Sequence, residues 1–295
     1  MFDCNWKMQV IIGEYDAMAI SAKTTDRITA QIKKFQPILS QAVAKDENES
    51  DTSVIICDML CDVFGYDKYR DVSTQHAIKG LKADFEIIVD GTARFLVEAK
   101  AVGVALKDSQ VTQVVTYGAN QGTEWVILTN GQLWRLYKIH FGQPINSSLL
   151  CEIDVLNVSP KNSKWSELIE CFGNLSRENF SKPSMNDYFE QKQLTSKYAV
   201  AAAILSEPML IELRRELRRL SSGLKLDVDY LATLITNEVI KRDLIDSDEG
   251  KNAQALIRHL QKSYAKDKER SEIEEKGSAQ STVQIPTQSQ QGIPE

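Results

Sequence analysis

Two carboxylates and a lysine at the ends of two neighbouring β-forming runs are the residues best suited to chemistry. The stretch KADFEIIVDGTARFLVEAK, residues 82–100, carries Asp84 near its start and Glu98 and Lys100 at its end. Carboxylate oxygens suit Mg²⁺, which keeps several waters and completes its shell with a group such as phosphate. A lysine beside them can orient a nucleophile or stabilise developing negative charge. These residue types predict phosphodiester hydrolysis; a solvated ion pair at a strand end is the alternative.

The loop between the two runs decides whether Asp84 can reach Glu98. Alternate residues of a strand share a face. A two-residue turn at Asp90-Gly91 with regular pairing places Asp84 opposite Val97, on the wrong face. A three-residue loop or a β-bulge places Asp84 on the Glu98 face. Chemistry at this position therefore predicts an odd-numbered loop or a bulge.

Three further polar residues can join this group. Gln113 and Tyr117 are four residues apart, so they share one face of the helix expected after the lysine. Both can offer hydrogen-bonding groups to the site or to a DNA backbone, although such residues are more often surface and half-buried core. Glu49 begins an earlier helix and can supply a third carboxylate. Its alternative role is a favourable charge at a helix N-terminus, worth about 1 kcal/mol at most.

The hydrophobic pattern predicts helices before this stretch. Helical periodicity from residue 25 is interrupted at Pro37, which lacks the N–H that a helix ladder needs. A second helix ends at Gly65. Its candidate N-terminal caps are Asp46, Asn48 and Asp51.

Alternating patterns then predict strands near residues 73–79, 83–89 and 94–99. A helix near 109–120 follows, and then two strands, EWVILT and LWRLYKI, separated by Asn130-Gly131, a strong hairpin signal. Residues 25–157 therefore form a mixed α/β domain with a central sheet flanked by helices. Residues 1–24 give no clear assignment beyond a short strand at residues 8–12.

Residues 158–264 show helical patterns and almost no strand, and residues 265–295 are rich in Ser, Gln and Pro, which predicts a disordered tail. Within the helical region a basic stripe could contact phosphates; its members are Arg214, Arg215, Arg218 and Arg219. The alternative is a solvated helix with ion pairs to Glu212 and Glu216, in which Leu213, Leu217 and Leu220 face inward. These helices could equally serve a homodimer or a partner subunit.

Composition narrows the class of protein. The net charge of −6 gives no whole-protein reason to expect nucleic acid, so such binding must come from a local patch. The sequence contains no membrane-spanning run and no signal peptide, which predicts a cytoplasmic protein. The five cysteines lack paired spacing, so neither a disulfide framework nor a zinc site is expected. No GxxxxGK[ST] and no GxGxxG occurs, so no ATP or dinucleotide site is expected.

Four segments together resemble a known family. NESDTSVIICDMLCDVFGYD, KADFEIIVDGTARFLVEAKA, QVVTYGAN and WVILTNGQLWRLYKI are similar to the N-terminal nuclease domain of type I restriction enzyme R subunits and their small stand-alone relatives, within the PD-(D/E)xK superfamily. The order Asp, ExK, QxxxY and LTNGxxWxLY is specific, whereas ExK alone is weak. The resemblance covers roughly residues 25–157.

The resemblance implies a Mg²⁺-dependent, or Mn²⁺-dependent, DNA endonuclease of restriction or repair type. It implies Asp84 and Glu98 as metal ligands, Lys100 as the catalytic lysine, Gln113 and Tyr117 as the QxxxY motif, and Glu49 as the acid of the first core helix. The Asn130-Gly131 turn and Trp134 would be structural. DNA is the implied partner, with restriction-system subunits as further partners. A catalytically silent nucleic-acid-binding or assembly module of the same fold is the alternative.

Two departures from the family pattern stand out. Ser53 occupies a position where relatives often carry a basic residue, and Lys82-Ala83 precedes Asp84 in place of a proline. The first weakens the expectation of a DNA contact at this position. The chain also lacks the ATP-driven motor of the full R subunits, so ATP-dependent restriction would require a partner that supplies it.

Overall fold

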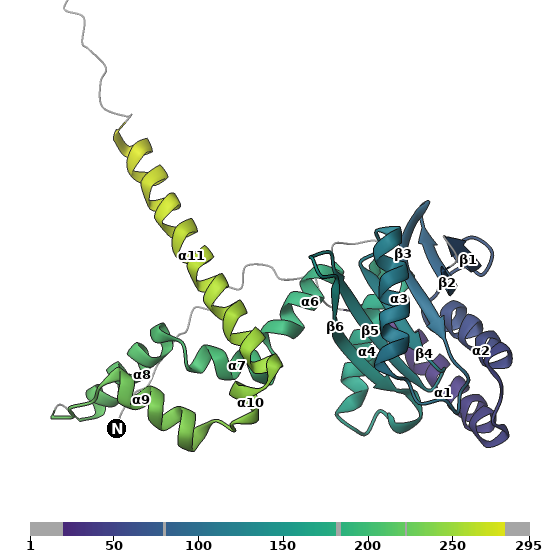
Figure 1. The fold of residues 1–295 in the computed structure, drawn as a ribbon, viewed down its shortest axis with the longest axis horizontal. Coiled ribbons are helices and arrows are strands. Elements are labelled where there is room, and N and C mark those ends of the chain that lie inside the picture. The colour runs from purple at the N-terminus through teal and green to yellow at the C-terminus, as the bar shows by residue number, and fades with distance from the viewer. Residues whose placement is uncertain (1–19, 79–80, 181–183, 222, 281–295) are drawn as a thin grey trace, which may run out of the picture. The chain divides into compact units, whose positions relative to one another are not determined.

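One six-stranded sheet is the frame of the first half of the chain. The computed structural model describes residues 20–78, 81–180, 184–221 and 223–280. The strands are β1 (Val72–Ile78), β2 (Leu81–Val89), β3 (Thr92–Ala99), β4 (Trp125–Thr129), β5 (Leu133–His140) and β6 (Asn146–Asp154). They lie side by side in chain order, and all neighbours are antiparallel except β3 and β4, which are parallel (Figure 1). The predicted mixed sheet is confirmed.

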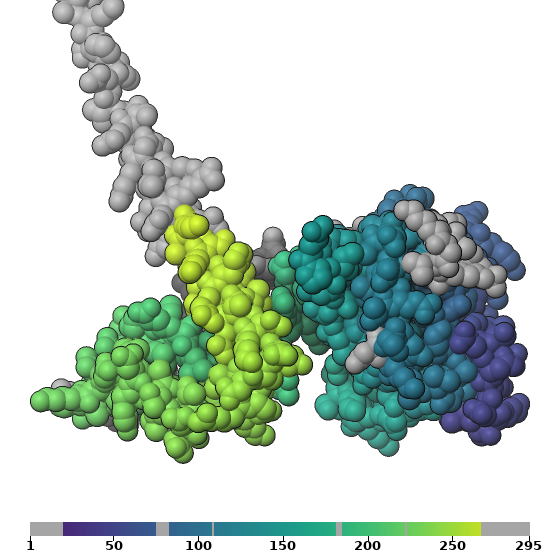
Figure 2. All heavy atoms as spheres, viewed as in Figure 1, coloured from purple at the N-terminus to yellow at the C-terminus, as the bar shows by residue number. Residues whose placement is uncertain are grey.

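Helices cover both faces of this sheet. The elements of one face are α1 (Ala22–Lys45), α2 (Glu49–Asp62), α4 (Lys164–Leu175), α5 (Arg177–Phe180) and α6 (Ser184–Leu194); α3 (Asp108–Gln121) covers the other. Strand β3 shows the division, because Phe95 and Val97 join the larger apolar cluster with α1 and α2, whereas Leu96 joins the cluster under α3. The space-filling view shows α1 and α2 as the purple surface (Figure 2).

Helix α1 is continuous through Pro37, so the predicted interruption was wrong. Pro37 faces solvent, while Ile28, Ile32, Phe35 and Leu39 form a buried stripe on the opposite side. A proline in a helix interior costs about 3 kcal/mol. Full burial of each large apolar side chain contributes about 1.5–3 kcal/mol, so the stripe outweighs the proline.

The sequence pattern missed strand β6. Its first half, Asn146 to Ser148, is polar, and only Cys151 and Ile153 are buried. The strand is held at the sheet edge by antiparallel pairing with β5, where Trp134 lies opposite Ile153. An edge strand with few inward apolar residues gives little alternation in sequence, which explains the omission.

The first compact unit extends to Lys192, later than the expected boundary at residue 157. After β6 comes a 3₁₀ turn, η1 (Val155–Asn157), and then α4, α5 and α6. The helices return apolar side chains to the core of the sheet, among them Phe172, Phe180 and Tyr188. The strand-poor pattern of this region therefore belongs to the α/β unit, because helices are what cover that face.

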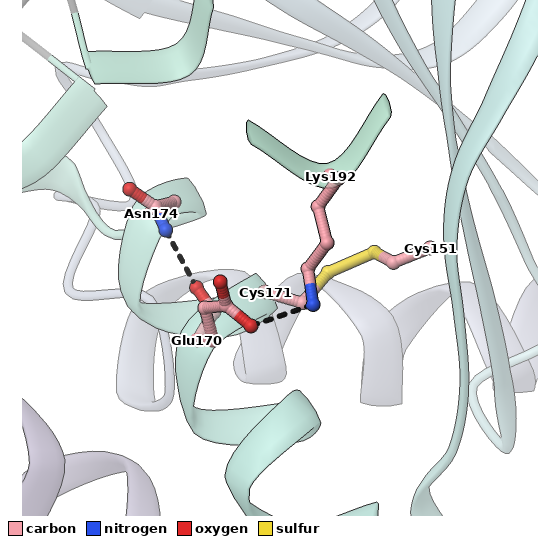
Figure 3. Close-up of a disulfide and its surroundings, with 5 residues drawn as sticks. All are labelled: Cys151, Glu170, Cys171, Asn174 and Lys192. Carbon is pink, nitrogen blue, oxygen red and sulfur yellow. Dashed lines mark hydrogen bonds and ion pairs between the residues drawn. A yellow bond between two sulfur atoms is a disulfide. The ribbon is translucent and has the colours of Figure 1, made fainter. Parts of the chain in front are cut away.

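Cys151 of β6 and Cys171 of α4 form a disulfide, which the sequence analysis did not expect (Figure 3). Both residues lie in the larger apolar cluster. Their separation of 20 residues, with no CxxC pattern, gave no sequence signal. Nearby, Lys192 of α6 forms an ion pair of 2.7 Å with Glu170 of α4, which fastens the last helix of the unit (Figure 3).

The second compact unit, from residue 193, is helical in its described residues. Its elements are α7 (Lys197–Ile204), α8 (Glu207–Leu220), α9 (Val228–Leu234), a π-helical turn η2 (Ile235–Val239), α10 (Asp243–Asp246) and α11 (Asp248–Gln280). Asp227 caps α9, because its carboxylate accepts the Val228 N–H at 2.8 Å.

The disordered tail predicted from residue 265 was wrong for residues 265–280, which continue helix α11. The run from Lys266 to Lys276 is rich in Lys, Glu and Arg, which are good helix formers. The residues after Gln280, and the strand expected at residues 8–12, lie outside the described residues. Among the described helices, none is long and apolar enough to cross a membrane.

Candidate active site

The β2–β3 hairpin turns at Asp90-Gly91 with only two residues between the strands. Val89 pairs with Thr92 across the turn. Asp90 and Gly91 have φ values of 51° and 73°, the positive values that the common two-residue hairpin turn requires. With regular pairing, this turn would leave Asp84 on the wrong face.

A β-bulge corrects the register within three residues of the turn. The pairs are Val89–Thr92, Ile88–Ala93, Ile87–Phe95 and Phe85–Val97. Arg94 is therefore the extra residue of β3, and from there on every residue of β2 faces a partner one position further along. The next step of this register places Asp84 opposite Glu98. The bulge predicted from the chemistry is confirmed.

Four predicted site residues meet at the end of β3. Lys100 Nζ donates a hydrogen bond to Glu98 Oε1 at 2.7 Å and lies 3.7 Å from Glu49 Oε2. Asp84 Oδ2 accepts the backbone N–H of Ala99 at 2.8 Å. Helix α2 thus supplies Glu49, β2 supplies Asp84, and the end of β3 supplies Glu98 and Lys100.

Burial makes this cluster electrostatically unusual. The side chain of Glu98 is 6% exposed and that of Lys100 is 16% exposed, whereas that of Glu49 is 53% exposed. Burial raises the pKa of Glu98, and the charges of Asp84 and Glu49 raise it further against the opposing effect of Lys100. Burial alone would lower the pKa of Lys100, but the hydrogen bond to Glu98 and the surrounding carboxylates outweigh it and raise that pKa. Lys100 is therefore a cation at neutral pH.

Glu49 stands at the first turn of α2 because Asn48 caps this helix. Asn48 Oδ1 accepts the Asp51 N–H at 3.0 Å, as expected for one of the three proposed caps. A carboxylate at this position is also favoured by the helix dipole. The helix start therefore holds Glu49 beside Lys100.

Two residues that the sequence analysis did not single out as site residues hold the loop after Lys100. Asn130 Nδ2 donates to the carbonyls of Val102 and Val104 at 3.1 and 3.0 Å. Thr52 Oγ1 accepts the Val102 N–H at 3.1 Å. Both side chains are buried. The Asn130-Gly131 signal was interpreted as a turn, and that turn exists, but its asparagine also fixes the backbone beside the lysine.

Trp134 has the structural role expected of it. Its side chain is buried against Phe64 and Phe172, and its indole N–H donates to the Gly131 carbonyl at 2.8 Å.

Gln113 and Tyr117 lie on α3, which covers the sheet face that Glu98 shares with Leu96. Gln113 is exposed, whereas Tyr117 is 1% exposed within the apolar cluster under α3. The Tyr117 hydroxyl accepts a hydrogen bond from Gln121 Nε2 at 3.0 Å. Tyr117 therefore helps to dock α3 on the sheet, and a role for either residue in chemistry stays a prediction.

The carboxylates fit a hard cation held by few protein ligands. Among the described residues, no group of three or more His, Cys, Asp or Glu side chains converges as a complete metal cage. Mg²⁺ characteristically takes one or two carboxylates and completes its shell with waters and substrate phosphate. Asp84 and Glu98 each use one oxygen in a hydrogen bond, and in the described part of the chain their other oxygens make none. That donor set suits Mg²⁺ or Mn²⁺.

A groove of about 550 Å³ leads to this cluster. Helix α2 forms one wall, and β1 and β2 form the other. The lining residues are Glu49, Ser50, Ser53, Val54, Cys57, Lys68, Thr74, Asp84 and Phe85. Two of the predicted site carboxylates, Glu49 and Asp84, therefore face an open channel.

The arginine stripe on α8 is largely paired within its own unit. Arg215 and Arg219 form ion pairs with Glu212 and Glu216, and Arg218 donates to the carbonyl of Leu226 at 2.8 Å. This arrangement matches the solvated-helix alternative, and phosphate binding by the stripe stays a prediction.

The inward face assigned to α8 was partly wrong. Leu220 is 80% exposed and Leu213 is 38% exposed, whereas Leu210 is the buried leucine. Leu217 packs against the Leu210 cluster. The helix turns its 210 and 217 positions inward because α9 lies against that side.

Comparison with known proteins supports the resemblance drawn from the sequence. Residues 55–148 match the family described as type I restriction enzyme R protein N terminus (HSDR_N). The matched segment contains Asp84, Glu98 and Lys100, and Glu49 lies six residues before it. No curated protein and no solved structure matches the chain. Residues 55–148 therefore form a domain like the N terminus of the restriction enzyme R protein.

Proposed function

We propose that this protein is a metal-dependent endonuclease that hydrolyses DNA phosphodiester bonds in restriction, defence or repair. The observation that carries the proposal is the meeting of Asp84, Glu98, Lys100 and Glu49 at the end of β3 beside an open groove. The family matched over residues 55–148 supports a nuclease-related function in restriction.

The side chains divide the work by their electrostatics. Asp84 and Glu98 would hold the cation, each oriented by the hydrogen bond that occupies its other oxygen. A bound Mg²⁺ or Mn²⁺ would polarise the phosphate and lower the pKa of a water. Lys100, which donates a hydrogen bond to Glu98, would stabilise negative charge on the phosphate or orient the attacking water.

Charge balance argues for the cation. Glu49, Asp84 and Glu98 surround a single lysine, Lys100, and a phosphate brings a further negative charge to the same place. Like charges at close range disfavour binding, so a DNA strand needs a divalent cation at the carboxylates before it can approach. We therefore propose that metal and DNA bind together.

The test is incubation of the purified full chain with supercoiled and linear DNA, with Mg²⁺ or with EDTA. We expect cleavage with Mg²⁺, none with EDTA, and a loss of at least a hundredfold in rate for Lys100→Ala. Lys34→Ala is the matched control, because Lys34 is also ion-paired with a carboxylate but lies outside the cluster. Absence of cleavage with any divalent metal, or equal cleavage by Lys100→Ala, would overturn the proposal.

A silent DNA-binding or assembly module of the same fold is the second candidate. Its support is the acidic net charge of −6. Retention of DNA in the same experiment without cleavage would favour this candidate. We propose further that ATP-dependent restriction would require a partner subunit that supplies the motor, since the sequence has no GxxxxGK[ST] motif.

A further inference from the structure

The groove beside the carboxylates is lined by a lysine other than Lys100, namely Lys68. Lys68 lies in the connection between α2 and β1 and lines the same groove as Glu49 and Asp84. Its ammonium is 3.1 Å from Asp58 of α2, and both side chains are 48% exposed. The groove therefore has the acidic cluster at the start of α2 and a solvent-facing lysine near the other end of this helix.

The α2 wall between these two ends carries hydroxyl groups. Ser50 and Ser53 are three residues apart on the helix, so they share the face that lines the groove. Thr74 lines it from β1. Hydroxyl donors and a lysine are groups that contact phosphate oxygens in protein–DNA interfaces.

We propose that the strand to be cut runs along this face of α2, and that Lys68 binds a backbone phosphate away from the scissile one. This inference rests on the proposed nuclease function and adds the path of the substrate.

The length of α2 sets the position of that phosphate. Asp58, which holds Lys68, follows Glu49 by nine residues, or about 13 Å of helix at 1.5 Å per residue. The rise of about 3.4 Å per nucleotide along the duplex axis is shorter than the spacing of successive phosphates in one strand, so this distance spans fewer nucleotides than the rise alone would give. Lys68 would therefore contact a phosphate near the bond that is cut but distinct from the scissile one.

The pair with Asp58 does not prevent this role. An ion pair between exposed side chains contributes about 0–1 kcal/mol, so exchange of Asp58 for a phosphate costs little. Asp58 nevertheless competes for the ammonium and repels the phosphate. Its neutralisation should therefore strengthen DNA binding, whereas removal of Lys68 should weaken it.

The experiment measures binding of the full chain to a labelled 20-base-pair duplex by fluorescence anisotropy at several salt concentrations. Ca²⁺ replaces Mg²⁺ to supply a cation for the carboxylates, and the same mixtures are checked for cleavage. For Lys68→Ala we expect a loss of roughly fivefold to tenfold in affinity near 0.1 M salt and a salt slope smaller by about 0.9. Lys68→Arg should restore binding, and Asp58→Asn should tighten it.

Lys34→Ala is again the matched control. Lys34 of α1 pairs with Asp62 of α2, the helix that also carries Asp58, but Lys34 does not line the groove. Equal affinities and salt slopes for Lys68→Ala and Lys34→Ala would overturn the inference, and so would absence of DNA binding by the unaltered chain. A parallel single-turnover assay in Mg²⁺ separates the two proposals. DNA binding that depends on Lys68 without any cleavage would refute the nuclease function but support DNA binding in the groove. If the chain cleaves DNA, and the cleavage rate of Lys68→Ala depends on protein concentration in the same way as that of the unaltered chain, only the role of Lys68 in the groove would be refuted.

Discussion

Replacement of Lys100 by methionine isolates the charge that holds the acidic cluster together. The variant keeps an unbranched side chain of similar length but removes the ammonium that Glu98 accepts from at 2.7 Å. Loss of a hydrogen bond to a charged group costs about 1.5–3 kcal/mol, and loss of one partner of a fully buried ion pair costs about 3–5 kcal/mol. Because the Lys100 side chain is 16% exposed, we expect the free energy of unfolding to fall by about 2–3 kcal/mol at pH 8.

The loss should depend on pH, with a defined sign. The pKa of Glu98 is already raised in the folded protein, chiefly by burial, and Lys100 opposes that rise. Without Lys100, the folded state binds a proton at Glu98 even more readily than the unfolded state does. A group of this kind favours folding most below its unfolded pKa, and that contribution is lost as the pH rises through the folded pKa. The variant should therefore be less destabilised at pH 5 than at pH 8.

Tryptophan fluorescence provides an assay that reports on the first compact unit alone. The four tryptophans are Trp6, Trp125, Trp134 and Trp165, and none lies beyond residue 192. For a unit of this size, 1 kcal/mol shifts Tm by about 2–4 °C, so Lys100→Met should lower Tm by roughly 5–10 °C at pH 8. Far-UV circular dichroism would verify that the variant folds.

Lys34→Met is the control, since the Lys34–Asp62 pair has the same 2.7 Å separation but side chains that are 56% and 40% exposed. Such a pair contributes about 0–1 kcal/mol, so its Tm should change little at either pH. An unchanged Tm for Lys100→Met at pH 8 would refute the assignment of a buried charge pair. An equal decrease at pH 5 and pH 8 would show that removal of Lys100 does not raise the pKa of Glu98 further in the folded protein.

Three further changes have defined outcomes. Asn130→Ala leaves two carbonyls without their donor, so we expect a loss of about 1–3 kcal/mol in urea unfolding and slower DNA cleavage. Reduction of the Cys151–Cys171 disulfide, which spans 20 residues, should lower stability by about 3 kcal/mol, and a Cys151→Ala/Cys171→Ala variant should not respond to reductant. Deletion of Arg94 removes the bulge but leaves Ile87 opposite Phe95 and Asp84 opposite Glu98, so we expect both DNA cleavage and the circular dichroism spectrum of a folded α/β protein to persist.

The elements around the site could be predicted because their residues carry strong local patterns. Strands β2 and β3 bury Phe85, Ile87, Phe95 and Val97 on one face, and this alternation is visible in the sequence. Helix α1 and strand β6 were harder to predict from the sequence. In α1 the burial of a continuous apolar stripe decides against a break at Pro37. In β6 the pairing with β5 supplies order that its own residues do not signal.

The contacts of the site depended on residues distant in sequence. Thr52 and Asn130 meet the loop after Lys100 from elements that precede and follow it, so no local spacing links them to the lysine. Tyr117 shows the opposite case. A tyrosine and a glutamine at helical spacing matched a motif, yet Tyr117 is buried in the core under α3, where packing accounts for its position.

The bulge at Arg94 meets a packing requirement and a chemical requirement at once. Asp90-Gly91 alone favours the tight two-residue turn that β2 and β3 adopt, and regular pairing from this turn would put Phe85 and Ile87 on the face opposite to Phe95 and Val97. That turn with regular pairing would separate Asp84 from Glu98. If the two carboxylates are to share a cation, the extra residue must lie between the turn and Asp84, and it does. The same extra residue brings Phe85, Ile87, Phe95 and Val97 to one core face, so core packing and the carboxylate site require the same register.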